Sequence, residues 1–298
     1  MELRDTPQDL VFVGHACYDE VIGYQEPPRV APGSAVLCGA LAAARVGRAV
    51  AVVTRASPRD DRVVEELRWS GVALHVVPVE QTTYMKVVHP SPDVDERELY
   101  QLASAGRFTL EDVPPLAARQ VHLAGISDQE FDLAFLRGLA ARGLRLSIDL
   151  QSFVRQVQPG TGRIAFRDVP GKQEIVRHVE RVKLDVVEAR ILTGTDDLEA
   201  AARIIEGWGC PEVVITRADG VLARAGGRTF HERFTNRSVV GRTGRGDTAF
   251  AAYLARRLDH DVPASLRFAA ALVSIKMEAP GPFRGTLDDV LARMNERT

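Results

Sequence analysis

The chain has 298 residues, of which 45% are hydrophobic and 26% are charged, and its formal net charge is −2. This length fits one large α/β domain or two small ones with a substantial core, and the near-neutral charge gives no electrostatic footprint for nucleic acid. With three scattered cysteines, no signal-peptide layout and no apolar run of membrane length, the sequence argues against a disulfide framework and indicates a cytoplasmic protein.

The first third of the chain alternates short apolar strands with helices. The expected elements are a strand at 10–15, a helix at 35–46, a strand at 49–54, an amphipathic helix at 60–70 and a strand at 72–77. This alternation indicates a parallel sheet with helices on both faces. Cys38 falls in the first helix, where we expect a small buried residue.

Two strand-like runs, 82–89 and 97–103, interrupt this alternation and are joined by an acidic, turn-rich segment at 90–96. The alternation then resumes with a strand at 121–125, a helix at 128–142 and a strand at 144–149. Polar side chains follow this last strand, at the edge where ligands bind in open α/β sheets. Gln151 and Arg155 are therefore candidates for contact with a substrate or phosphate, and a solvated surface charge is the alternative for Arg155.

A glycine-rich stretch near the C-terminus precedes an alanine-rich helix expected at 248–258. Gly241, Gly244 and Gly246 allow several N–H groups to point the same way, and the helix N-terminus adds its partial positive charge, so the stretch predicts an anion site. Asp247 follows in the first helical turn. It is suited to accept a proton from an alcohol beside the anion site; the alternative is that it only caps the helix.

The segment Thr243-Gly244-Arg245-Gly246-Asp247 resembles the T-G-A-G-D signature of the ribokinase-like (PfkB) carbohydrate kinase family. The resemblance implies an α/β fold of three αβα layers, with a central, mostly parallel sheet and a small β lid. It also implies transfer of the γ-phosphate of ATP to an alcohol, with Asp247 as the catalytic base, an anion hole at Gly244, Arg245 and Gly246, and donor contact at Thr243. Arg245 replaces the usual alanine. Gly241 replaces an aspartate that helps many members to hold a monovalent cation, so potassium activation is not implied here.

A second segment, 182–194, resembles the family's Asn-x-x-Glu signature. The resemblance assigns Glu188 to Mg²⁺, usually through water, and Asp185 replaces the asparagine while keeping an oxygen ligand. A carboxylate that only satisfies the helix dipole is the alternative for Glu188.

The remaining assignments also come from the resemblance. Thr216, Arg217 and Gly220 match a strand and turn that hold the nucleotide, and 269–277 matches a final helix beside adenine. Asp19, Gly33 and Ser34 match the sugar site, where a carboxylate suits hydrogen bonding to a diol. The whole chain, 1–298, is expected to be one kinase domain with a lid from about 18–32 and 80–104.

The sequence therefore predicts an ATP- and Mg²⁺-dependent kinase for a small sugar or polyol. The alternatives are a nucleoside or inositol kinase of the same family, or a non-catalytic regulatory protein that binds ATP or sugar, suggested by the altered Asp185, Gly241 and Arg245. We expect a small-molecule partner, no nucleic acid and no membrane, and a possible homodimer through the lid. No P-loop or dinucleotide-binding glycine motif is present in the sequence.

Overall fold

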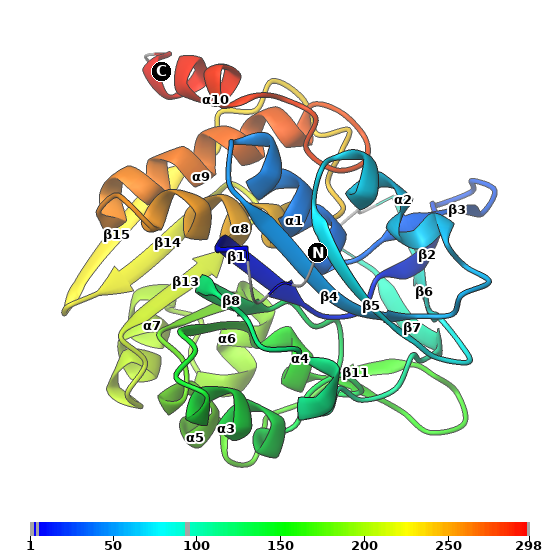
Figure 1. Ribbon diagram of the computed structural model, residues 1–298. Helices are drawn as coiled ribbons and strands as arrows, with labels where there is room; N and C mark the ends of the chain where they lie inside the picture. Colours follow the sequence, from blue (N-terminus) through cyan, green and yellow to red (C-terminus); the bar gives the residue numbers. More distant parts are fainter. Residues whose placement is uncertain (1–2, 4–5, 93–95, 297–298) are drawn as a thin grey trace.

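A nine-stranded sheet lies at the centre of the computed structural model, which describes residues 3, 6–92 and 96–296 (Figure 1). The strand order is β15-β14-β13-β12-β9-β8-β1-β4-β5. The bounds are β1 (Gln8–Val13), β4 (Val50–Ala56), β5 (Ala73–Pro78), β8 (Ala118–Leu123), β9 (Leu146–Asp149), β12 (Arg181–Asp185), β13 (Glu212–Thr216), β14 (Gly220–Ala225) and β15 (Arg228–Arg233). All pairs from β5 to β13 are parallel, and β14 and β15 are antiparallel. The predicted, mostly parallel sheet is confirmed.

Helices cover both faces of the sheet, so the strands read as continuous apolar runs. In β1, Leu10 and Phe12 pack into one core, and Val11 and Val13 pack into the other. One face carries α1 (Ala35–Arg45), α8 (Arg245–Arg257) and α9 (Val262–Met277), with α10 (Leu287–Asn295) outside α9, and the other carries α3 (Leu133–Ala141), α5 (Lys172–Arg177), α6 (Val186–Thr193) and α7 (Leu198–Gly207) (Figure 1). The short α2 (Arg62–Trp69) packs beside α1 and β5.

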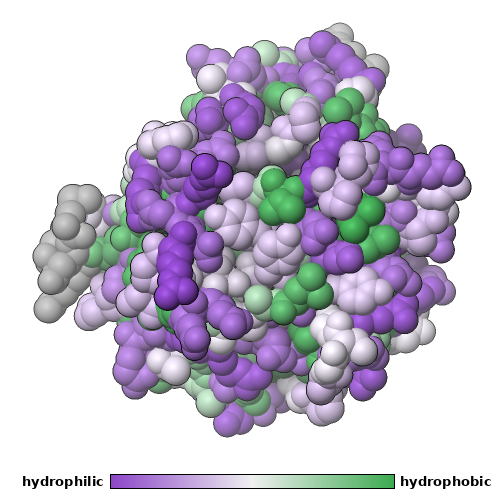
Figure 2. All heavy atoms as spheres, turned by 90° about the vertical axis from the view of Figure 1, so that its right-hand side faces the viewer, coloured by the Kyte–Doolittle hydropathy of each residue, from purple (hydrophilic) through white to green (hydrophobic). Residues whose placement is uncertain are grey.

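A second, four-stranded sheet projects from the side of the main one. Its order is β3-β2-β6-β7, with β2 (Cys17–Ile22), β3 (Arg29–Gly33), β6 (Thr83–Val88) and β7 (Glu98–Ala103). Because side chains alternate along a strand, Cys17 and Asp19 face inward, whereas Tyr18 lines a groove on the outer face with Val30 and Leu102. Figure 2 shows this side of the molecule, where hydrophobic side chains form small separate patches among polar ones.

Several local expectations differ from the structure. The helix expected from 128 begins only at Leu133, because the side chain of Asp132 accepts a hydrogen bond from the amide of Phe135 and caps the helix there. The helix expected at 269–277 is the end of the longer α9, and it is not final, since α10 follows. The sequence also did not predict α4 (Gln151–Val154) or the hairpin of β10 (Arg155–Val157) and β11 (Ile164–Phe166). Residues 93–95 of the expected acidic linker lie outside the described residues.

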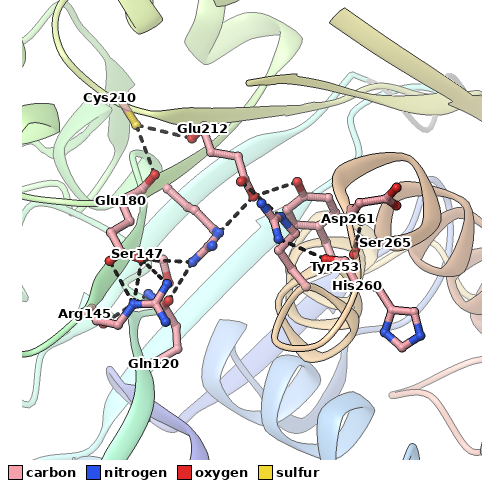
Figure 3. Close-up of polar contacts among 12 residues, drawn as sticks. Gln120, Arg145, Ser147, Glu180, Cys210, Glu212, Tyr253, His260, Asp261 and Ser265 are labelled. Carbon is pink, nitrogen blue, oxygen red and sulfur yellow. Dashed lines mark hydrogen bonds and ion pairs between the residues drawn. The ribbon is translucent and has the colours of Figure 1, made fainter. Parts of the chain in front are cut away.

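A buried polar network fixes α8 against the sheet (Figure 3). Glu212 at the start of β13 is 4% exposed and accepts hydrogen bonds from Arg181 Nε at 2.8 Å, Tyr253 Oη at 2.7 Å and Arg257 Nε at 3.2 Å. Because Tyr253 and Arg257 belong to α8, the network anchors the C-terminal half of that helix to β13. The opposite end of α8 then projects at the carboxyl edge of the parallel strands, where ligands bind in sheets of this kind.

Candidate active site

The N-terminus of α8 presents unpaired backbone amides. Gly244 has φ 76° and precedes the first helical residue, and a Cβ at this position would lie 2.5 Å from Sγ of Cys38, so only glycine fits. The amide of Arg245 donates to Arg242 O at 3.1 Å. The amides of Gly246 and Asp247 make no hydrogen bond to another main-chain group in the described part of the chain. A helix start of this kind is a site for an anion.

A buried lysine lies beside these amides. Lys183 of β12 is 2% exposed, and its Nζ pairs with Asp149 Oδ2 at 2.7 Å. A Cβ built on Gly246 would lie 3.0 Å from this Nζ and 3.5 Å from Oγ1 of Thr216, so both side chains lie close to the backbone of Gly246. Burial lowers the pKa of Lys183, but Asp149 and the other nearby carboxylates outweigh burial and raise it overall. The lysine therefore brings a permanent positive charge to the site.

Asp247 lies in the first turn of α8 and is half-buried. Gln151 Nε2 lies 3.5 Å from its Oδ1 and also donates to the carbonyl of Gly125 at 2.8 Å. The second bond is the shorter and fixes the amide of Gln151, which then limits how the carboxylate of Asp247 turns. Gln151 thus contacts Asp247 through Nε2, and its predicted contact with a substrate stays a prediction.

Asp19, the sugar-site candidate, lies in β2 of the four-stranded sheet. Burial raises its pKa to about 6, the thiol of Cys17 at 3.3 Å opposes this rise, and the charge of Asp247 adds to it. The two carboxylates are therefore close enough to affect each other. Gly33 lies against Asp19, since a Cβ on residue 33 would lie 2.0 Å from Oδ2. Ser34 has φ 116°, an unusual value for a residue with a side chain, and its Oγ accepts the amide of Leu37 to begin α1.

The two carboxylates assigned to magnesium differ in their surroundings. Glu188 is fully buried; Oε1 accepts from Arg155 Nη2 at 3.0 Å and Oε2 accepts from the amide of Asp185 at 2.8 Å. Oδ1 of Asp185 accepts a hydrogen bond from the amide of Glu188 and so caps α6. Oδ2 of Asp185 lies 4.0 Å from Nη2 of Arg155. Among the described residues no group of three or more His, Cys, Asp or Glu could hold a metal directly. Carboxylate oxygens suit Mg²⁺ through its water shell, so a metal here would be held chiefly by donor phosphates, and the assignment of Asp185 and Glu188 to magnesium stays a prediction.

Arg155, a candidate for substrate contact, forms a hydrogen-bonded ion pair with Glu188. Among the residues assigned to the donor, Thr216 ends β13 and its hydroxyl donates to Leu184 O at 3.3 Å. Arg217 turns toward Asp219, with Nε 3.0 Å from Oδ1. Gly220 is required at its position because a Cβ there would lie 2.5 Å from Glu232 O.

Arginines gather at the donor end of the site. Nη1 of Arg245 lies 3.3 Å from Ala218 O, at the turn between β13 and β14. The pKa of Arg245 is lowered to about 10, chiefly by burial and also by the charges of Arg242 and Arg97. The side chain of Thr243 is exposed, while its carbonyl accepts from Lys276. Lys183, Lys276 and Arg97 were not predicted from the sequence; a charged residue within an apolar strand or helix was the available signal for the two lysines.

Comparison with known proteins gives matches along almost the whole chain. The family model described as pfkB family carbohydrate kinase matches residues 5–287. The cytidine kinase of Thermococcus kodakarensis is 31% identical over 260 residues, which span 83% of this chain and 87% of that protein. Within the described residues, no helix is both long and apolar enough to cross a membrane.

Solved structures agree with this match. The sulfate complex of a pyrophosphate-dependent kinase in the ribokinase family has a TM-score of 0.88 and 31% identity, with 95% of this chain and 99% of that chain covered. A pyrophosphate-dependent kinase of the same family, complexed with a pyrophosphate analogue and myo-inositol, has a TM-score of 0.86 and 29% identity, with 95% and 99% covered. The ribokinase of Arabidopsis thaliana, with ribose and ATP, shares the fold at a TM-score of 0.79 and 18% identity, with 98% and 100% covered.

Proposed function

Since this chain belongs to the pfkB family of carbohydrate kinases, we propose that it transfers the terminal phosphoryl group of ATP to an alcohol group of a small sugar or polyol. The observation that carries this proposal is the position of Asp247, which lies beside the unpaired amide of Gly246 and near enough to Asp19 for its charge to raise the pKa of that residue. One carboxylate can take a proton from the acceptor while the other holds a neighbouring hydroxyl.

The chemistry follows from these positions. Asp247 removes the proton from the attacking hydroxyl, and its own orientation is limited by Gln151. The amides at the start of α8, with Lys183 beside them, stabilise the charge on the phosphoryl group in transfer. Magnesium, when bound, neutralises the donor phosphates, and Asp185 and Glu188 are the residues that would hold it, through its water shell.

Pyrophosphate is a second candidate for the donor. The charges of Arg97 and Arg242 both lower the pKa of Arg245, so positive charges lie near one another at the donor end of the site, which suits a compact anion that carries no base or ribose. The similar solved structures include pyrophosphate-dependent kinases of the ribokinase family. The Arg245 guanidinium, close to Ala218 O, also lies at the turn assigned to the nucleotide by resemblance.

The acceptor is proposed to be a sugar or a cyclitol. Asp19 suits a vicinal diol, which sugars, cyclitols and nucleosides all offer. The similar structures include one with myo-inositol bound, and the curated relative is a cytidine kinase, so a nucleoside is the alternative acceptor. For the assembly we propose a homodimer through the outer face of the lid sheet, where Tyr18, Val30 and Leu102 line the groove.

One experiment tests the proposed activity. The purified protein is supplied with ATP or with pyrophosphate, each across a panel of sugars, cyclitols and nucleosides, and the phosphorylated acceptor is detected by mass. We expect one acceptor class to give turnover well above hydrolysis of the donor. If ATP or pyrophosphate binds but no acceptor is phosphorylated, the proposed transfer is wrong.

A further inference from the structure

A second buried lysine lies behind the anion site, and the chemistry described above does not use it. Lys276, near the C-terminal end of α9, is 2% exposed and is among the largest fully buried side chains of the described chain. Its Nζ donates to the main-chain carbonyls of Gly241 and Thr243. No carboxylate of the described residues forms an ion pair with it. A buried ammonium without a carboxylate is costly unless polar atoms surround it, so its presence calls for a reason.

The two carbonyls belong to the 238–243 loop, which leads directly into Gly244 and the unpaired amides of α8. The side chains of Val239 and Val240 are 58% and 64% exposed, so apolar packing does little to hold this loop. Two amides of the loop bind the end of α9, since Val240 N and Gly241 N donate to Met277 O at 2.9 Å and 2.8 Å. The ammonium group of Lys276 binds two carbonyls of the same loop.

The backbone at Gly241 leaves no room for a side chain that could hold the loop from within. A Cβ on residue 241 would lie 1.7 Å from Ala279 O and 2.9 Å from Lys276 O. The loop therefore packs closely against the C-terminal end of α9, and its carbonyls at Gly241 and Thr243 both accept from the ammonium group of Lys276 in that helix. A cation at the C-terminal end of a helix is also favoured by the helix dipole.

We propose that Lys276 is a positioning residue for phosphoryl transfer: its ammonium acts as a built-in monovalent cation that binds the carbonyls of the 238–243 loop and so fixes the anion-binding amides of α8. Carbonyl oxygens that converge on one point can replace the hydration shell of a potassium ion, and an ammonium group with its three donors can bind the same oxygens. With the lysine in place, the enzyme needs no monovalent cation from solution at this loop. The inference rests on the proposed function, because the amides must serve the transfer.

The test removes the ammonium group of Lys276 by substitution and then supplies a monovalent cation from solution. Lys276→Ala should lower kcat by about tenfold or more, because misplaced anion-hole donors cost that much or more, while KM for the acceptor stays close to that of the wild type. Ammonium or potassium chloride, added at constant ionic strength against tetramethylammonium chloride, should restore kcat in a saturable way. Tetramethylammonium is too large to fit between the carbonyls.

Two further variants make the result specific. Lys276→Met fills the space with an apolar chain, so it should lose kcat without rescue by any cation. Lys172→Ala is the matched control: its Nζ also donates to a main-chain carbonyl, Leu192 O at 2.6 Å, but at the opposite end of α6 from Asp185. This control should keep its kcat and show no response to cations.

The outcomes separate this inference from the proposed function. If the wild type phosphorylates no acceptor, the proposed function fails first. If the wild type is active and potassium stimulates it, or if Lys276→Ala keeps its kcat, the inference is wrong. Loss of kcat in a folded Lys276→Ala without rescue would reduce Lys276 to a structural role. Should both Lys276 variants fail to fold, the cation response of the wild type decides, and we expect none.

Discussion

The carboxylate of Asp19 lies directly against the backbone of Gly33, with Oδ2 only 2.0 Å from where a Cβ on residue 33 would stand. The two residues come from neighbouring strands of the lid sheet, in which Asp19 pairs with Ala31. The missing side chain at Gly33 is therefore what lets Asp19 turn into the site.

Gly33→Ala tests this relationship. The new methyl group displaces the carboxylate, so KM for the acceptor should rise by about tenfold or more, the cost of one lost charged hydrogen bond. The KM for the donor should not change. Gly207→Ala is the control, because a Cβ there meets nothing within 4 Å; it should leave both constants as they are. An unchanged acceptor KM in Gly33→Ala would show that Asp19 does not bind the acceptor.

The pKa of Asp19 predicts a pH dependence. Since burial raises the pKa from 3.8 to about 6, the carboxylate gains a proton below that pH and loses an acceptor site for substrate hydroxyls. We expect kcat/KM for the acceptor to fall about tenfold per pH unit below pH 6. The pH profile of Asp19→Asn should lack this limb. A wild-type profile that is flat between pH 5 and pH 7 contradicts the assignment.

The raised pKa of Asp19 also predicts that replacing this residue with asparagine stabilises the folded protein. A raised carboxyl pKa means that the charged form costs the folded state free energy; the cost is present in full above about pH 6 and is absent below 3.8. Asp19→Asn should therefore raise the free energy of unfolding at pH 8 by up to roughly 3 kcal/mol. The gain should shrink toward pH 4. Denaturant unfolding at the two pH values measures it, and an equal gain at both would point to another cause.

Lys183→Met should affect both stability and turnover. It leaves Asp149 buried without its partner, which costs about 3–5 kcal/mol. Without Lys183 to lower it, the pKa of Asp149 is raised further by burial, and the carboxyl takes up a proton as the pH falls. The loss of unfolding free energy should therefore be smaller at pH 5.5 than at pH 8. The kcat should fall as well, since the ammonium beside Gly246 is gone. A stability loss that does not change with pH would argue against a charged pair.

Tyr253→Phe should change stability alone. It removes the hydrogen bond to the buried carboxylate of Glu212, which costs about 1.5–3 kcal/mol because the acceptor is charged. The bond lies in the C-terminal half of α8, whereas Asp247 lies in its first turn. Thermal unfolding and kcat measured on the same preparation check this, and we expect kcat within about twofold of the wild type. A larger fall would mean that the network in Figure 3 controls the site directly.

Much of the fold could be predicted from the sequence because its signals are local. Apolar runs such as that of β1 and the glycine after α1 mark elements by themselves. The start of α3 was placed too early because its cap, Asp132, stands among other polar residues that could equally have begun a helix. The hairpin of β10 and β11 has only three residues in each strand, too few for periodicity to show.

The polar partners within the site could not be predicted, because they join distant parts of the chain. Lys276 binds carbonyls 35 and 33 positions earlier, and Lys183 pairs with Asp149 across 34 positions. Arg155 was a candidate for substrate contact, but the pattern gave no sign that Glu188 would take its guanidinium. The pair of Lys183 and Asp149, for example, arises because β9 and β12 lie side by side, which only the folded sheet decides.

The turnover of Asp247→Asn tests the central claim most directly. The substitution keeps the shape and the contact with Gln151 but removes the base, so kcat should fall by about 10²–10⁴-fold. The dissociation constant of the donor, measured by calorimetry, should remain close to that of the wild type. A variant that keeps kcat within tenfold of the wild-type value would contradict the account, because another group would then take the proton.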